Sequence, residues 1–286
     1  MKNLQAKHRR SLLLNAPHLL WSIIFIVAPL LMVAIYAFRD RSGSWTLDTF
    51  RSLFTDKESA LNLLFIFRSS LWYALLATAI CLLLAYPLAY FMAHAGKRVQ
   101  RNLMMLITVP MWMNFLICTY SWIAILSERG GLLNLLLARL HLPEQTILYT
   151  PKAVVLGMVY NYLPFMILPI YTVLSKLQPS LVEAAQDLGA TRWQVLRKIT
   201  LPLSVPGVIS GVTMVFVPSV STFYISKKLG GNKNQLIGDL IEAKFTTFSD
   251  RNGGAALSLI LMVMVLLSMV FMRRLSKDDD GAYVAG

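Results

Sequence analysis

Six long apolar segments recur along the 286-residue chain, each close to the length needed to cross a bilayer. A hydrocarbon core about 30 Å thick requires roughly 20 apolar residues in a helix, and within lipid a helix satisfies its own backbone hydrogen bonds. The pattern therefore predicts an all-α integral membrane protein with six transmembrane helices in one domain, residues 16–272. The expected spans are residues 16–38, 69–93, 103–126, 153–174, 204–225 and 255–272.

The composition excludes an ordinary soluble domain, because 56% of the residues are hydrophobic and only 14% are charged, against about 25% charged in soluble proteins. All 14 acidic residues lie outside the expected spans. Ion-coupled carriers usually place Asp, Glu or His within the membrane, and here only His18 lies in a span, at its very start. A stand-alone channel or ion-coupled carrier is therefore disfavoured, although it stays open as an alternative.

Eight of the twelve prolines fall inside the expected spans. Each frees a backbone carbonyl group that neighbouring helices or water must satisfy. Kinks absorbed by helix packing are one interpretation. Bent helices around a cavity are the other, and they favour a transporter over an inert anchor. The shorter apolar piece 131–140 cannot span a bilayer, so we expect an interfacial or re-entrant helix there.

The sequence holds no recognisable catalytic motif. No G-x-x-x-x-G-K-[ST] phosphate loop, H-E-x-x-H zinc motif or G-x-S-x-G nucleophile motif occurs. Cys81 and Cys118 lie in apolar segments without a Cys or His neighbour at metal-ligand spacing. We therefore expect no catalytic residue, no metal site and no cofactor bound by this chain, and we do not expect an enzyme.

The formal charge of +13 comes largely from basic residues that cluster at the ends of the apolar segments. This placement is typical of anchoring to anionic lipid headgroups, so membrane lipid is an expected partner and nucleic acid is not. The basic N-terminus, the short connection 94–101 and the pair Arg273-Arg274 favour cytoplasmic termini. Residues 1–15 are thus expected to be a cytoplasmic N-terminal segment and residues 273–286 a cytoplasmic tail.

A polar stretch, residues 179–202, separates the fourth and fifth expected spans. Ser180 and Glu183 have the S-x-x-E spacing of a capping box, which predicts the start of a helix. The helix is expected to run to Leu188 and to stop at Gly189, because glycine readily adopts the left-handed conformation after a helix end.

A second helix is expected after this corner. Thr191 and Gln194 form a T-x-x-Q capping box, and Pro202 is expected to end the helix. The stretch thus predicts helix, glycine corner, helix. An amphipathic pair lying on its own membrane domain and a docking element for a cytoplasmic partner both fit this pattern.

The spacing E-A-A-x-x-x-G followed by I-x-L-P resembles the EAA loop of ABC-importer permeases. In that family the loop forms cytoplasmic coupling helices that seat in a cleft of the ATP-binding subunit. The resemblance implies a cytoplasmic coupling-helix loop between spans 4 and 5 here. The implied coupling residues are Glu183, Ala184, Ala185, Asp187, Gly189, Arg192, Ile199, Leu201 and Pro202.

Residues 45–54, 160–171 and 223–238 resemble segments of permeases from spermidine/putrescine importers. The resemblance implies a permease subunit of an ATP-driven ABC importer for polyamines in the bacterial cytoplasmic (inner) membrane. It implies a second permease, two copies of an ATP-binding subunit that carry ATP and Mg, and an external substrate-binding protein. An importer of the same class for ferric ion, sulfate, thiamine or phosphonate stays open as the alternative.

The expected spans offer no carboxylate for a polycationic substrate, so aromatic faces are the available alternative, through cation–π contacts. Aromatic residues at span ends can equally be membrane-interface residues. The pair Lys227-Lys228 raises a conflict, because it would repel a polycation if it faced the entry path. The candidate substrate-pathway residues are Trp112, Asn114, Tyr120, Tyr160, Asn161, Tyr162, Phe223 and Tyr224.

Overall fold

The computed structural model describes residues 17–39, 43–55, 57–231 and 234–282. The expected N-terminal segment 1–15, residues 232–233 of the segment 223–238 and the last four residues of the expected tail lie outside the described residues. Within the described ranges the regular structure is helical, apart from one bridge between Arg39 and Trp45. The helices are η1 (Ile23–Val27), α2 (Ala28–Phe38), α3 (Asp48–Thr55), α4 (Lys57–His94), α5 (Lys97–Trp112), α6 (Phe115–Leu126), α7 (Leu132–Arg139), α8 (Pro151–Leu174), α9 (Pro179–Asp187), α10 (Arg192–Val195), η2 (Leu196–Thr200), α11 (Leu201–Val220), η3 (Ser226–Gly230), α12 (Ile237–Thr246) and α13 (Arg251–Ala282).

The prediction of an all-α membrane protein is confirmed. Among the described residues, five helices are long and apolar enough to cross a membrane, and a sharply bent pair of helices brings the number to six if it counts as one span. The five are Pro17–Phe38, Lys57–His94, Pro151–Leu174, Arg192–Val220 and Arg251–Met272, and the bent pair is Lys97–Trp112 with Phe115–Leu126.

The third expected span, residues 103–126, is not one continuous helix. Helices α5 and α6 meet at an angle of 95°. Met113 is extended, with ψ of 149°, and the side chain of Asn114 accepts a hydrogen bond of 2.8 Å from the backbone N–H of Leu116. Asparagine is a strong N-cap residue, so Asn114 starts a new helix inside an otherwise apolar segment.

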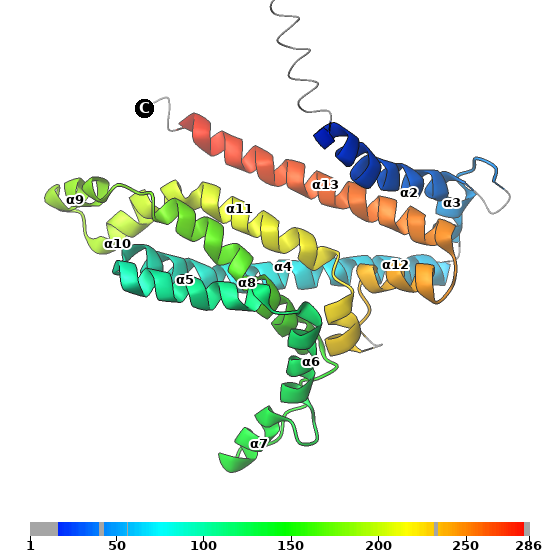
Figure 1. The fold of residues 1–286 in the computed structure, drawn as a ribbon, viewed down its shortest axis with the longest axis horizontal. Coiled ribbons are helices and arrows are strands. Elements are labelled where there is room, and N and C mark those ends of the chain that lie inside the picture. The colour runs from blue at the N-terminus through cyan, green and yellow to red at the C-terminus, as the bar shows by residue number, and fades with distance from the viewer. Residues whose placement is uncertain (1–16, 40–42, 56, 232–233, 283–286) are drawn as a thin grey trace, which may run out of the picture. The chain divides into compact units, whose positions relative to one another are not determined.

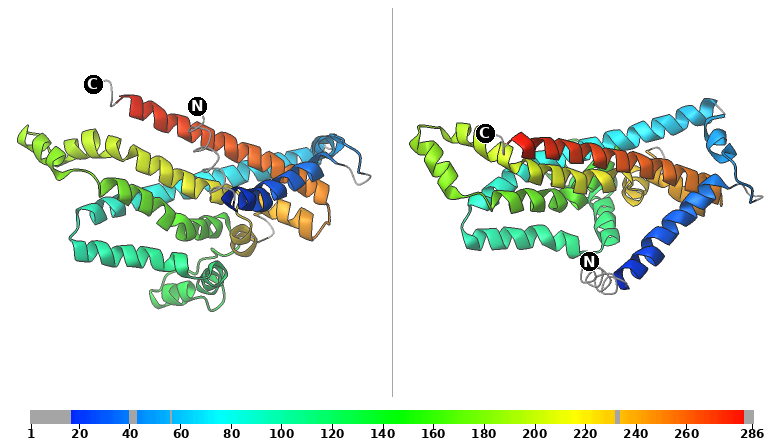
Figure 2. Two further views of the ribbon diagram at one scale, coloured as in Figure 1. Left: turned by 45° about the horizontal axis from the view of Figure 1, so that its top comes forward. Right: turned by 90° about the horizontal axis from the view of Figure 1, so that it is seen from above.

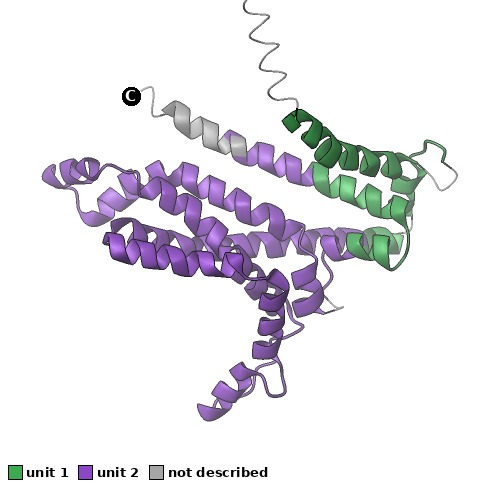
Figure 3. Ribbon diagram, viewed as in Figure 1, with its two compact units in different colours: residues 1–62, 241–263 green, residues 63–240, 264–286 purple. Residues whose placement is uncertain are grey.

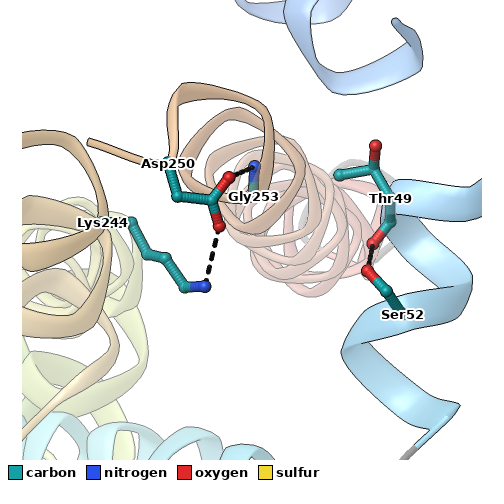
Figure 4. A network of polar contacts seen from close by, with 5 residues as sticks. All are labelled: Thr49, Ser52, Lys244, Asp250 and Gly253. Atoms are coloured by element: carbon teal, nitrogen blue, oxygen red, sulfur yellow. Dashed lines mark hydrogen bonds and ion pairs between the residues drawn. The ribbon is translucent and has the colours of Figure 1, made fainter. Parts of the chain in front are cut away.

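The chain divides into two compact units, residues 1–62 with 241–263 and residues 63–240 with 264–286 (Figure 3). In the first unit, Ala37 of α2 packs with Ala255 and Ala256 of α13. Figure 4 shows a polar contact in the same unit, where Lys244 and Asp250 form an ion pair of 2.9 Å. The other carboxylate oxygen of Asp250 accepts the backbone N–H of Gly253 at 3.1 Å, which caps the start of α13.

The core of the second unit is built around α8 and α11, which lie side by side in the views of Figures 1 and 2. Two glycines of α11 permit the close approach. A Cβ atom on Gly207 would lie 3.0 Å from the carbonyl oxygen of Pro169. A Cβ atom on Gly211 would lie 2.8 Å from the sulfur of Met166. Small residues four apart allow helix backbones to approach closely within a membrane, and these two do so here.

Candidate coupling loop and aromatic cluster

Helix α9 begins at Pro179, one position before the expected capping box. Gln178 is the N-cap and makes no side-chain capping bond, so the predicted Ser180–Glu183 box is wrong. Proline is favoured at the first helical position, because its missing N–H would have no partner there and its φ suits a helix. With Pro179 in that position, Ser180 lies inside the first turn and cannot serve as the cap.

The glycine corner is confirmed. Gly189 has φ of +85°, in the left-handed region that glycine adopts without steric cost. The N–H of Gly189 donates to the carbonyl of Gln186 at 2.8 Å, and the N–H of Ala190 donates to the carbonyl of Ala185 at 3.0 Å. A Cβ atom on Gly189 would meet nothing within 4 Å, so the requirement for glycine here is conformational.

The second capping box is also confirmed, but the helix does not end where expected. The N–H of Gln194 donates to the Thr191 hydroxyl at 3.3 Å, and the N–H of Thr191 donates to the Gln194 side chain at 2.8 Å. The prediction that Pro202 ends this helix is wrong, because α10, η2 and α11 form one helix of 29 residues, Arg192–Val220. In η2 the N–H of Leu201 bonds the carbonyl of residue 196, five residues back, and this wide turn accommodates the proline that follows.

This continuous helix is longer than a bilayer requires. At 1.5 Å per residue, its 29 residues extend about 44 Å, against about 30 Å of hydrocarbon. The polar α10 end therefore protrudes from an apolar span while forming one helical rod with it.

Most of the predicted coupling residues, and several apolar side chains beside them, are exposed. Leu188 is 90% exposed, Trp193 is 67% exposed and Leu181 is 47% exposed. We call these three residues the α9 surface, although Trp193 belongs to the adjoining helix α10. Helix α9 buries none of its residues. By contrast, Val195 of the second helix is only 4% exposed, so α10 is anchored in the fold. Glu183, Ala184, Asp187, Gly189, Arg192 and Leu201 are exposed, and Ala185, Ile199 and Pro202 are partly buried.

A cluster of aromatic residues forms beyond the other end of α11. The Nζ atom of Lys228 lies 5.4 Å from the centroid of the Tyr120 ring and 6.0 Å from that of the Tyr224 ring. The Tyr224 ring also lies 5.7 Å from the ring of Phe115. We call Tyr120, Tyr224 and Lys228 the tyrosine–lysine cluster. Two of the predicted pathway residues therefore meet, although 104 positions separate them in the sequence.

A second set of predicted pathway residues lines a pocket of about 410 Å³. Its lining includes Tyr162 of α8, together with Phe223 and Tyr224. The Tyr162 hydroxyl is 3.5 Å from the carbonyl oxygen of Pro218. The pocket thus joins α8 to the segment that follows α11.

The remaining predicted pathway residues have local roles. Trp112 is 88% exposed, and Asn114 is the helix cap described above. The Asn161 side chain donates to the carbonyl of Gly157, one turn earlier in its own helix, at 2.7 Å. Tyr160 makes an edge contact with Trp122, with 5.4 Å between ring centroids. The structure does not bring these four candidates into the tyrosine–lysine cluster.

The sequence reading missed the turn that carries Lys228. The N–H of Tyr149 donates to the carbonyl of Leu229 at 2.8 Å, and the Asn234 side chain donates to the carbonyls of Tyr149 at 3.1 Å and Gly230 at 2.8 Å. A Cβ atom on Gly230 would lie 2.6 Å from Val154. The sequence signal for this turn was the glycine pair followed by asparagine. The residue that Asn234 contacts, Tyr149, lies 85 positions away in the sequence, so the pairing could not be predicted.

Comparison with known proteins places the chain in a family. Residues 85–278 match the model of the binding-protein-dependent transport system inner membrane component. The chain belongs to this family. It is 38% identical over 262 residues to the spermidine/putrescine transport system permease protein PotB of Escherichia coli (strain K12), covering 88% of this chain and 93% of that protein. It is 30% identical over 287 residues to the inner membrane ABC transporter permease protein YdcU of the same organism, covering 94% of this chain and 90% of that protein.

The fold agrees with this membership. A solved bacterial alginate ABC transporter, in complex with an alginate pentasaccharide-bound periplasmic protein, aligns with a TM-score of 0.76 at 19% identity, covering 96% of this chain and 97% of that one. With the family match and the identity to PotB, the chain is a multi-pass inner-membrane permease subunit of an ABC importer.

Proposed function

We propose that this chain is a permease subunit of an ATP-driven importer of polyamines such as spermidine and putrescine. The observation that carries the proposal is its 38% identity over 88% of its length to a spermidine/putrescine permease. The tyrosine–lysine cluster supports it independently, since two tyrosine rings lie within about 6 Å of an ammonium group, the distance at which cation–π attraction acts.

The α9 surface is the proposed contact with an ATP-binding subunit, of which the complex has two copies. An exposed leucine and an exposed tryptophan beside a fixed corner suit a protein cleft, because aromatic anchors in pockets dominate interface energetics. The ATP and Mg sites belong to that subunit. We further propose that α9, α10 and both chain termini lie on the cytoplasmic side.

Helix Arg192–Val220 is the proposed transmission element. Its polar end is anchored next to the corner, while Gly207 and Gly211 hold its middle against α8. The Tyr86 hydroxyl and the Ser204 hydroxyl are 3.0 Å apart, which ties the same helix to α4. A displacement at α10 is therefore carried through packed helices to the tyrosine–lysine cluster.

A second permease and an external substrate-binding protein complete the proposed assembly. The external protein would deliver its solute at the end of the permease that bears the tyrosine–lysine cluster. The translocation path between the permeases is proposed to pass Tyr120, Tyr162, Phe223 and Tyr224. Four further residues remain proposed members of this path, although their contacts in this structure are local: Trp112, Asn114, Tyr160 and Asn161.

The experiment that tests the substrate combines the cognate binding protein with the purified complex. We expect the binding protein to bind putrescine or spermidine, and the loaded form to stimulate ATP hydrolysis by the complex. Stimulation by sulfate-, thiamine- or ferric-loaded binding protein, with no polyamine binding, would replace the polyamine assignment with another solute. No stimulation of a well-folded complex by any loaded form would remove the importer function itself.

A further inference from the structure

The ammonium group of Lys228 lies where a free alkylammonium ion would also be attracted. Its distances of 5.4 Å and 6.0 Å to the Tyr120 and Tyr224 centroids fall within the range of cation–π attraction. Three separate segments build this setting. Helix α6 supplies Tyr120, the segment after α11 supplies Tyr224, and η3 supplies Lys228.

A pocket of about 860 Å³ borders Tyr120 and Lys228, whereas Tyr224 lines the neighbouring pocket of about 410 Å³. Tyr120, Lys227 and Lys228 line the larger pocket, together with Tyr149 and one carboxylate, Glu128. Sites for small molecules usually measure about 300–1,000 Å³, so a diaminoalkane fits this volume. The lining combines aromatic faces with the carboxylate of Glu128, which are the two groups that attract an alkylammonium ion.

The lysine is held in this position by the surrounding groups. A hydrogen bond from its ammonium group to the Tyr120 hydroxyl, together with the electrostatic influence of the same phenol, raises the pKa of Lys228. Its side chain is therefore cationic at neutral pH. The backbone of η3 is tied to Tyr149, whose N–H donates to the carbonyl of Leu229 at 2.8 Å.

We propose that Tyr120 and Tyr224 form a binding subsite for a primary alkylammonium group, and that the Lys228 side chain occupies this subsite until such a cation arrives. Lysine carries a primary ammonium on an unbranched four-carbon chain, which is the chemistry of each end of a diaminoalkane. Exchange replaces one ammonium by another at the rings, while Lys228 moves into the open pocket. The identity of the substrate rests on the proposed function, but the exchange requires only alkylammonium chemistry.

This proposal resolves the conflict raised by the lysine pair. A positive charge at the mouth repels a polycation only while it stays between the polycation and its site. Here Lys228 occupies the site itself and competes for it. The lysine therefore weakens binding by competition, and it prevents small inorganic cations from occupying the tyrosine pair.

The test measures equilibrium binding of labelled putrescine to the purified permease complex without its binding protein. We expect Lys228→Met to tighten binding by about two- to fivefold, the range of one cation–π contact at an exposed site. Lys227→Met removes the same charge from the adjacent residue in the same pocket and is the matched control. Its effect should be clearly smaller, because Lys228 is the lysine whose ammonium group lies over the Tyr120 and Tyr224 rings.

A double-mutant cycle separates competition from simple charge repulsion. In a Tyr120→Leu background the subsite is incomplete, so Lys228→Met should have no larger effect than Lys227→Met. Tyr120→Phe keeps the ring and should retain most of the difference. If Tyr120→Leu does not fold, Tyr224→Leu completes the same cycle.

Equal effects of the two lysine substitutions, or a Lys228 effect that persists unchanged in the Tyr120→Leu background, would overturn the proposal. These outcomes are distinct from a failure of the proposed function. Competitive binding of putrescine without polyamine-stimulated ATP hydrolysis would keep the subsite and reject the polyamine importer. Polyamine-stimulated hydrolysis without the lysine effect would reject the subsite alone.

Discussion

Gly211 of α11 lies directly against Met166 of α8, so that a Cβ atom on the glycine would lie 2.8 Å from the methionine sulfur and 3.1 Å from its carbonyl oxygen. The flexible side chain can move aside, but the carbonyl belongs to the backbone of α8 and cannot. The contact therefore fixes the separation of the two helices that form the core of the second unit. It also makes the α8–α11 interface sensitive to added volume.

Replacement of Gly211 by Leu should destabilise the permease by about 1–3 kcal/mol, the usual cost of overpacking a well-packed core. The thermal unfolding midpoint in detergent measures this loss. Gly96→Leu is the matched control, because it adds the same side chain where a Cβ atom would meet nothing within 4 Å. Equal midpoints for Gly211→Leu and the control would show that the helices are not in close contact.

Replacement of Gly189 by Val should weaken coupling without removing any packing contact. The left-handed conformation costs an ordinary residue about 1–2 kcal/mol, and a β-branched residue is especially poor there. We expect less ATP-binding subunit to co-purify with Gly189→Val. Asn tolerates this conformation better, so Gly189→Asn should retain most of the binding. Normal co-purification of the Val variant would mean that the corner is not needed for docking.

Replacement of Leu188 by Glu should abolish or greatly reduce binding of the ATP-binding subunit while leaving the permease folded, because the side chain is 90% exposed. Gln186→Glu adds the same charge at an exposed neighbouring position of α9 and should have little effect. Measuring both the unfolding midpoint and subunit co-purification separates loss of binding from loss of folding. Unchanged binding by Leu188→Glu would remove the α9 surface from the proposed interface.

The sequence predicted the features that depend on residues close together in the chain. Hydropathy located the membrane helices, since lipid demands long apolar segments. The left-handed Gly189 and the Thr191–Gln194 box were predictable because each involves hydrogen bonds between residues a few positions apart. Two local predictions were wrong because a neighbouring residue or turn changed the local structure. Pro179 occupies the first helical position, so Ser180 cannot be the cap, and the wide turn of η2 before Pro202 allows the helix to continue.

Contacts between residues far apart in the chain could not be predicted from the sequence. Asn114 was predicted as a pathway residue inside one span, and the structure adds that it caps α6 at a 95° bend. Lys228 was recognised only as a charge opposing a polycation. Its contact with Tyr120 spans 108 positions, and no periodicity or motif encodes such a pairing.

The most direct measurement is uptake of labelled putrescine into proteoliposomes that contain the complete complex, with ATP enclosed and loaded binding protein outside. We predict uptake that requires ATP, requires the binding protein and is lost in Leu188→Glu. Uptake that persists without ATP, or in a permease that cannot bind its ATP-binding subunit, would contradict the account and indicate a channel or carrier.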